Sequence, residues 1–162
     1  QALIKTGLVP YGKIMEPSEE MPTLTFNTVG RHISRMAQTR LTSAISPWAQ
    51  DKSVLKGTHT VAISHGEGRI LCGSSLAKDL FNKGQVFSQY IDENGEPATK
   101  EPANPNGSAF AIEGLTSPDG HILGKMGHSE RTITKEAQNM LIKNASGNRN
   151  QDIFSAGVRY FQ

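Results

Sequence analysis

The segment from Phe110 to Met126 reads FAIEGLTSPDGHILGKM and contains the clearest local structure in the chain. Two apolar stretches, 111–115 and 121–126, flank the sequence SPDG at 117–120. Proline at the second position of a turn and glycine at the fourth are typical of a type I turn followed by a glycine bulge. The segment therefore predicts a β-hairpin.

Further strands are expected on both sides of this hairpin. Short runs of apolar and β-branched residues predict strands at 23–26, 31–43, 58–64 and 86–91. The stretch 92–107 contains three prolines and two glycines and is expected to be a loop.

Helices are expected between and after these strands. Ser74 or Ser75 can cap a helix that Gly84 ends. Apolar residues at helical spacing predict two more helices near the end of the sequence, one with Ile133, Ala137, Met140 and Leu141, the other with Ile153, Phe154, Val158 and Phe161. Strands that alternate with helices indicate an α/β domain.

Composition excludes several classes of protein. The 162 residues are the length of one domain, and the net charge of +2 comes without runs of basic residues. Neither nucleic acid nor a membrane is therefore an expected partner. The one cysteine, Cys72, excludes an internal disulfide, and a reducing, cytoplasmic location is the simplest interpretation.

The strongest chemical signal is Gly127-His128-Ser129-Glu130-Arg131, which follows the hairpin. Residues two apart in an extended segment point the same way, so His128 and Glu130 can face one site. A carboxylate that orients an imidazole is part of a nucleophilic triad. Taken alone, His-x-Glu is common, and a surface histidine near a helix start is the ordinary alternative.

Three other features are weaker. His65-Gly66-Glu67-Gly68 predicts a tight turn that shapes the wall of a site, and a metal there would need at least one more ligand. Cys72 has apolar neighbours and is expected to be a small core residue rather than a nucleophile. Asn27 and Arg31 could bind a substrate carboxylate, although solvated loop residues are the ordinary alternative.

Several of these motifs occur in one order that resembles a known family. Ser64-His65-Gly66-Glu67-Gly68-Arg69, then Asn104-Pro105-Asn106-Gly107-Ser108 and the segment from Gly124 to Arg131, resemble the amidotransferase domain of phosphoribosylformylglycinamidine synthase. The stretch from Asn27 to Arg31 is similar to its Asn-x-Ser-Gly-Arg element, with Val29 in place of serine, and the stretch from Phe154 to Phe161 is similar to its C-terminal end. The match covers nearly the whole chain.

The resemblance implies the fold of a class I (triad) glutamine amidotransferase, which is flavodoxin-like with a mainly parallel sheet and flanking helices. It implies that glutamine is hydrolysed and that ammonia passes to a synthetase domain, in the same chain or a separate one. There ATP activates formylglycinamide ribonucleotide and ammonia gives the amidine, a step of purine synthesis. No cofactor is implied for the glutaminase, whereas ATP and Mg²⁺ are expected in the synthetase part.

Carried over by position, His128 is the expected base and acid, Glu130 its orienting partner, and Gln1 a contact of the substrate glutamine. The family's nucleophilic cysteine falls four residues before Gln1. Residues 1–162 are therefore expected to be the C-terminal portion of a single amidotransferase domain, without the first strands and the nucleophile elbow, and inactive alone. An N-terminal helix already under way at Gln1 agrees with this expectation.

Three alternatives remain at the level of sequence. Gly127-His128-Ser129-Glu130, in place of the His-Pro-Glu of small subunits, favours a large fused enzyme over a separate glutaminase subunit. A catalytically dead binding module would explain the missing nucleophile. A plain α/β ligand-binding domain would leave the order of the motifs as coincidence.

Overall fold

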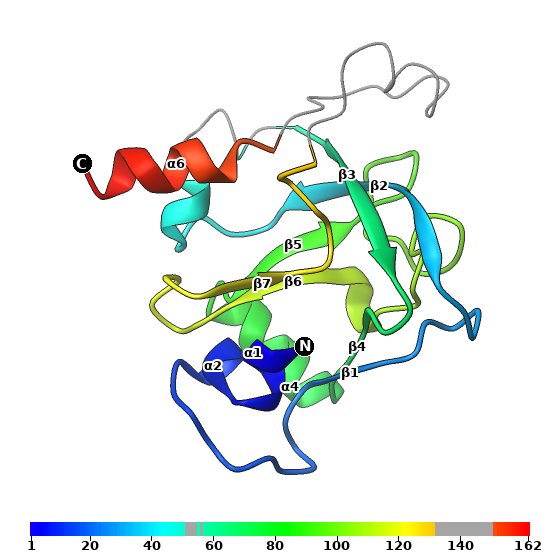
Figure 1. Ribbon diagram of the computed structural model, residues 1–162, viewed down its shortest axis with the longest axis horizontal. Helices are drawn as coiled ribbons and strands as arrows, with labels where there is room; N and C mark the ends of the chain where they lie inside the picture. Colours follow the sequence, from blue (N-terminus) through cyan, green and yellow to red (C-terminus); the bar gives the residue numbers. More distant parts are fainter. Residues whose placement is uncertain (51–54, 56, 132–150) are drawn as a thin grey trace.

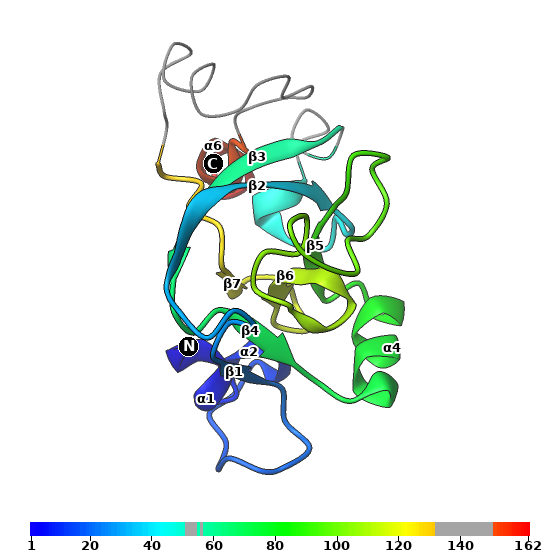
Figure 2. The same ribbon diagram turned by 90° about the vertical axis from the view of Figure 1, so that its right-hand side faces the viewer.

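The computed structural model describes residues 1–50, 55, 57–131 and 151–162 (Figure 1). The helix expected around Ile133, Ala137, Met140 and Leu141 lies outside the described residues. The described part has a curled five-stranded sheet, a two-stranded sheet and short helices around them (Figure 2). The α/β class is confirmed.

The five-stranded sheet has the order β3-β2-β5-β6-β7. In chain order its strands are β2 (Ile33–Leu41), β3 (His59–His65), β5 (Val86–Tyr90), β6 (Ile112–Thr116) and β7 (Leu123–Lys125). All of them lie where the sequence predicted strands.

The pairing of these strands differs from the mainly parallel sheet that was expected. Every strand pair of the described residues is antiparallel. Parallel neighbours need a long crossover connection, usually a helix. Here β5, β6 and β7 follow one another through loops and one tight turn, a connection that reverses the direction of the chain.

The hairpin of β6 and β7 forms as predicted. The Gly120 amide donates to the Ser117 carbonyl at 2.9 Å, which closes the turn. Gly120 has a φ of 75°, a left-handed conformation that side chains disfavour. A Cβ atom there would also lie 2.7 Å from the Cα atom of Ser46. The turn therefore needs glycine for its conformation and for its close approach to a neighbouring loop.

The smaller sheet pairs β1 (Thr23–Thr25) with β4 (Arg69–Leu71). The sequence predicted β1 but not β4, which is only three residues long and follows a glycine-rich turn. Helix α4 (Ser74–Asn82) comes next, and Gly84 follows it with a φ of 68°. The predicted serine cap is wrong: Gly73 is the N-cap and no side chain caps the helix, because Ser74 already lies in its first turn.

Short helices lie at the two ends of the sheet (Figure 1). Helices α1 (Ala2–Lys5) and α2 (Leu8–Tyr11) lie beside β1 and β6. Helix α6 (Ile153–Tyr160) packs on the 3-10 turn η1 (Pro47–Ala49). Another 3-10 turn, η2 (Ala109–Ala111), directly precedes β6. The N-terminal helix and the terminal helix expected from the sequence are therefore both present.

Two apolar clusters fill the space between these elements and the sheet. One joins α1 and α2 to β6 through buried Ile4, Val9 and Leu115. The other joins α6 to β2 and β5 through buried Ile153, Leu41 and Phe87. The β6–β7 hairpin passes between them, so both clusters support the segment that follows β7.

Candidate active site

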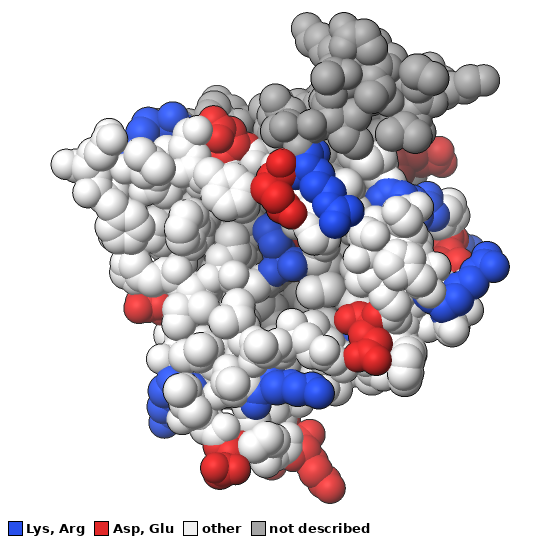
Figure 3. Space-filling view, viewed as in Figure 1, with Lys and Arg blue, Asp and Glu red and all other residues white. Residues whose placement is uncertain are grey.

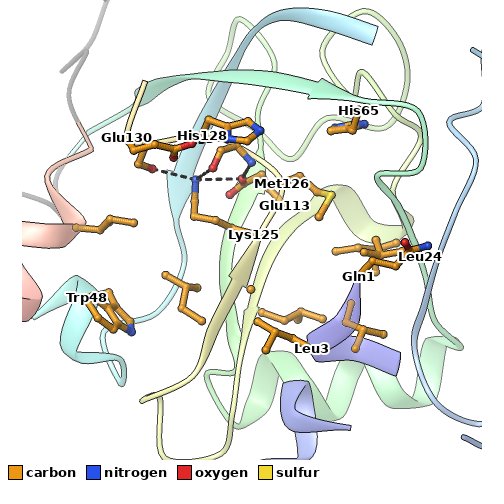
Figure 4. A pocket seen from close by; sticks show the side chains of 18 of the residues that line it. Gln1, Leu3, Leu24, Trp48, His65, Glu113, Lys125, Met126, His128 and Glu130 are labelled. Atoms are coloured by element: carbon orange, nitrogen blue, oxygen red, sulfur yellow. Dashed lines mark hydrogen bonds and ion pairs between the residues drawn. The ribbon is translucent and has the colours of Figure 1, made fainter. Parts of the chain in front are cut away.

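A pocket of about 520 Å³ opens beside the β6–β7 hairpin (Figure 4). Apolar side chains such as those of Leu3, Leu24 and Ile70 line part of it, and its polar lining comes from four parts of the chain. The polar side chains that line it are those of Gln1, His65, Glu67, Glu113, Lys125, His128, Ser129 and Glu130. The pocket is a concave, largely apolar space with a few convergent polar groups, as ligand sites usually are.

His128 is held by the edge strand of the sheet. Its amide donates to the Ala62 carbonyl of β3 at 2.7 Å, an isolated antiparallel bridge that keeps this stretch extended. The next side chain on the same side is that of Glu130. The Nδ1 atom of His128 lies 2.5 Å from Oε1 of Glu130. The structure thus brings together the two residues that the alternation of an extended chain had paired.

The charges of this pair follow from its geometry. The hydrogen bond from His128 lowers the pKa of the Glu130 carboxyl. An ionised carboxylate only accepts hydrogen bonds, so Nδ1 carries the proton and donates it. Nε2 is then the ring nitrogen that can exchange a proton with a ligand. The catalytic roles of His128 and Glu130 stay a prediction that this contact supports.

The turn after β3 forms another wall of the pocket. His65 and Glu67 both line it, as the sequence predicted for a turn that shapes a site. The ring of His65 lies over Gly68, where a Cβ atom would come within 2.3 Å of it. Burial lowers the pKa of the His65 imidazole. His65 is therefore a neutral, partly buried ring at neutral pH.

Asn27 holds this turn rather than lining the pocket. Its side-chain oxygen contacts His65 Nδ1 at 3.1 Å and accepts from the Gly68 amide at 3.2 Å. Its side-chain nitrogen donates to the carbonyls of His65 and Arg31. Arg31 is exposed and also stands outside the pocket lining. Substrate binding by Asn27 and Arg31 stays a prediction, and the contacts of Asn27 show a structural use for it.

Gln1 does lie at the pocket. Its side-chain nitrogen donates to Oε2 of Glu67 at 2.7 Å, and both residues line the same space as His128. The sequence resemblance predicted a substrate contact at Gln1. Gln1 and the His128–Glu130 pair line one pocket, and the substrate contact of Gln1 stays a prediction.

The sequence missed the polar pair beneath His128. Glu113 of β6 is fully buried, and Lys125 of β7 reaches its Oε1 atom at 3.2 Å. The signal was present in the sequence, because each strand of the predicted hairpin carries one charged residue among apolar and small ones. The hairpin interpretation used the apolar residues and the turn, and passed over the two charges.

Cys72 does not belong to the pocket. It is half-buried, packs against the apolar cluster that contains Ile70 and Leu80, and is absent from the pocket lining. Burial raises the pKa of its thiol, which disfavours the reactive thiolate. These observations fit the prediction that it is a core residue.

The described residues show no sign of some other kinds of site. Among them, no group of three or more His, Cys, Asp or Glu side chains could hold a metal ion. None of the described helices has the length and apolar character to cross a membrane. On the face drawn in Figure 3, acidic and basic side chains are interspersed rather than gathered by sign.

Comparisons with known proteins show what the chain is similar to. Phosphoribosylformylglycinamidine synthase subunit PurQ of Treponema denticola is 33% identical over 173 aligned residues, which cover 99% of this chain and 63% of that protein. The subunit of the same name from Methanococcus maripaludis strain C5 is 32% identical over 156 residues, 88% of this chain and 56% of that one. The chain thus spans less than two thirds of the length of these relatives.

A solved structure shows the same fold. The chain aligns with "Structure of PurLQS from Thermotoga maritima" at a TM-score of 0.65 and 19% identity, over 100% of this chain and 58% of that one. This likeness confirms a fold like that of class I glutamine amidotransferases. The family whose model matches residues 1–161 is described as a CobB/CobQ-like glutamine amidotransferase domain. With a match over nearly its whole length, the chain belongs to that family.

Proposed function

We propose that this chain carries the base and the orienting carboxylate of a glutaminase that supplies ammonia to phosphoribosylformylglycinamidine synthase. The observation that carries the proposal is the contact of 2.5 Å between His128 and Glu130 at the mouth of a pocket. The relatives named as subunits of that synthase support the choice of reaction.

The chemistry that follows is acyl transfer through a thiolate. His128 Nε2 takes the proton of a cysteine thiol, and the sulfur attacks the side-chain amide carbon of glutamine. The resulting imidazolium, stabilised by Glu130, returns the proton to the leaving nitrogen, and ammonia departs from a glutamyl thioester. His128 then activates water, which cleaves the thioester to glutamate and restores the thiol.

The thiol that this proposal requires would come from a cysteine other than Cys72. Cys72 is the one cysteine of the sequence and lies apart from the pocket that His128 lines. An oxyanion hole would need the amide that follows the nucleophile, so it would be completed by the residue after that other cysteine. The 162 residues alone are then expected not to hydrolyse glutamine.

Gln1 is the residue we propose at the substrate. It lines the pocket beside Glu67 and can present its amide to the glutamine. Asn27 and Arg31 remain weaker proposals for the substrate carboxylate. A contribution of Asn27 would come through the His65–Gly68 turn, which its side chain holds.

The ammonia is proposed to react in a synthetase part, where ATP and Mg²⁺ would activate formylglycinamide ribonucleotide. We favour a fused enzyme, on the sequence Gly127-His128-Ser129-Glu130. The relatives named as separate subunits support the alternative of two chains. The length of the open reading frame upstream of Gln1 decides between them. A cytoplasmic location is part of the proposal, because a thiol nucleophile needs a reducing compartment.

A catalytically dead binding module is the second candidate, and the distance of Cys72 from the pocket favours it. Glutamine-dependent ammonia release by the full natural gene product, measured beside a His128→Ala variant, separates the two. The glutaminase predicts activity that the substitution abolishes. The binding module predicts no activity in either protein.

A further inference from the structure

We propose that Glu113 and Lys125 form a buried charge pair that positions His128 for proton transfer. The proposal rests on the proposed function, because it assigns a purpose to the pair through His128. Neither residue touches the reacting atoms in it. Both are positioning residues that act on the two neighbours of His128, through the backbone of Gly127 and the hydroxyl of Ser129 (Figure 4).

The carboxylate of Glu113 is fully occupied. Its side chain has no exposed surface. Oε1 accepts from the Gly127 amide at 2.5 Å and from Lys125 Nζ at 3.2 Å. Oε2 accepts from the hydroxyl of Ser88 on β5. The hydrogen bond to Gly127 fixes the residue immediately before His128.

The ammonium of Lys125 fixes the other side. Its side chain is 9% exposed, and besides Glu113 it donates to the Gly127 carbonyl at 2.7 Å and to Ser129 Oγ at 3.1 Å. Ser129 in turn donates to Gln151 at 2.7 Å. The three N–H donors of the Lys125 ammonium thus have three acceptors. Two of the acceptors belong to Gly127 and Ser129, the direct neighbours of His128.

The surrounding glycines leave room for this arrangement. A Cβ atom on Gly127 would lie 2.8 Å from Glu113 Oε1 and 2.5 Å from a methyl group of Val61. A Cβ atom on Gly114 would lie 2.9 Å from Ser88 Oγ. The backbone can therefore approach the Glu113 carboxylate at Gly127, and the Ser88 hydroxyl that donates to it at Gly114, because both positions lack a side chain.

The energetics argue that stability alone does not explain the pair. Burying two charges costs desolvation, and a well-packed apolar pair at such positions is often as stable. The charges add directional hydrogen bonds, because Glu113 holds Gly127 and Lys125 holds Gly127 and Ser129, on the two sides of a histidine that needs a fixed orientation. A displacement of about 1 Å at a catalytic group can lower the rate on the order of 100-fold.

The test uses the full natural gene product and three variants: Lys125→Met, Glu113→Gln and the double variant. Each single change leaves one buried charge without its partner, whereas the double variant removes both. We expect the double variant to regain most of the thermal stability lost by Lys125→Met. Its kcat for glutamine hydrolysis should nevertheless stay on the order of 10-fold to 100-fold below wild type, with KM for glutamine unchanged. Lys78→Met, on the exposed face of α4, is the matched control and should leave kcat unchanged.

A second measurement does not depend on activity. Amide hydrogen exchange at Gly127 and His128 should accelerate on the order of 10-fold in the double variant, because the Gly127 amide loses its charged acceptor. The amide of Ala37 in β2 is the internal reference and should not change.

The outcomes are separable. A double variant with wild-type kcat, or with unchanged exchange at Gly127 and His128, would overturn the positioning role. An inactive wild type would instead remove the proposed function. In that case, faster exchange would still support the charge pair as the device that fixes this segment.

Discussion

Single residues set the shape of the pocket wall as much as its chemistry. His65 lies over Gly68, and Val61 and Glu113 lie against Gly127. In both places a side chain occupies the space that a Cβ atom would need. Gly68 of HGEG and Gly127 of GHSE are therefore steric requirements, each of which lets a polar group approach the backbone.

A substitution at Gly68 tests this directly. Gly68→Ala would place a methyl group 2.3 Å from the His65 ring. We expect it to lower the free energy of unfolding by about 1–3 kcal/mol, because the ring must move and break its contact with Asn27. Chemical denaturation measures this change. Gly66→Ala is the control, since nothing lies within 4 Å of its Cβ position, and an equal loss in both variants would contradict the prediction.

The pH dependence of the His128–Glu130 pair is a second prediction at this scale. Because the hydrogen bond from His128 lowers the pKa of Glu130, the interaction is fully present above the pKa of an unfolded glutamate. It is lost as pH falls through the lower pKa of the folded state. Titration of the Glu130 carboxyl by carbon NMR should give a pKa below the ordinary value, and His128→Ala should raise it. A pKa that His128→Ala leaves unchanged would show that the contact is not made.

The residues of the site were only partly predictable from the sequence. His128 and Glu130 are two apart in an extended stretch, so a local rule was enough to pair them. Glu113 and Lys125 meet only because the hairpin folds back, and their partners Ser88 and Gln151 come from distant segments. Asn27 was expected to bind a substrate, but its side chain contacts His65, which lies 38 residues further along the sequence.

At the scale of elements, local signals predicted most of the structure. The SPDG turn and the apolar stretches around it were sufficient for the β6–β7 hairpin. Strand β4 was missed because three residues carry too little pattern. The direction of strand pairing was also missed, since it follows from how the connections run and not from the composition of any strand.

Helix α6 packs closely on Trp48 at Gly157. A Cβ atom on Gly157 would lie 2.4 Å from the ring of Trp48, the one tryptophan of the sequence. We expect Gly157→Ala to push the helix away, lower the free energy of unfolding by about 1–3 kcal/mol and shift tryptophan fluorescence to the red. Val158→Ala, on the exposed side of the helix, is the control. Unchanged fluorescence in Gly157→Ala would contradict the packing described.

At the scale of the whole molecule, the chain is less than two thirds of the length of the subunits that it resembles. The pocket is lined by His128, Glu130 and apolar side chains, but Cys72 is not among the residues that line it. The proposed reaction therefore needs a thiol from elsewhere in the natural protein. Family membership and fold are established for the part described, while the complete reaction is a proposal.

Cys72 gives a prediction at this scale. In the full natural gene product, Cys72→Ala should leave kcat for glutamine hydrolysis within about 2-fold of wild type, because the thiol packs in the core and its pKa is raised by burial. Loss of a small buried side chain should lower stability by about 1 kcal/mol. Abolished hydrolysis in a folded Cys72→Ala protein would make Cys72 the nucleophile and overturn this assignment.

The most direct measurement is glutamine-dependent ammonia release by the full natural gene product, wild type beside His128→Ala, with ribonucleotide and ATP supplied. We predict an active wild type and a loss on the order of 10⁴-fold or more in the variant, because His128 would transfer every proton of the reaction. A wild type that releases no ammonia, or a His128→Ala protein that keeps its activity, would contradict the proposed glutaminase.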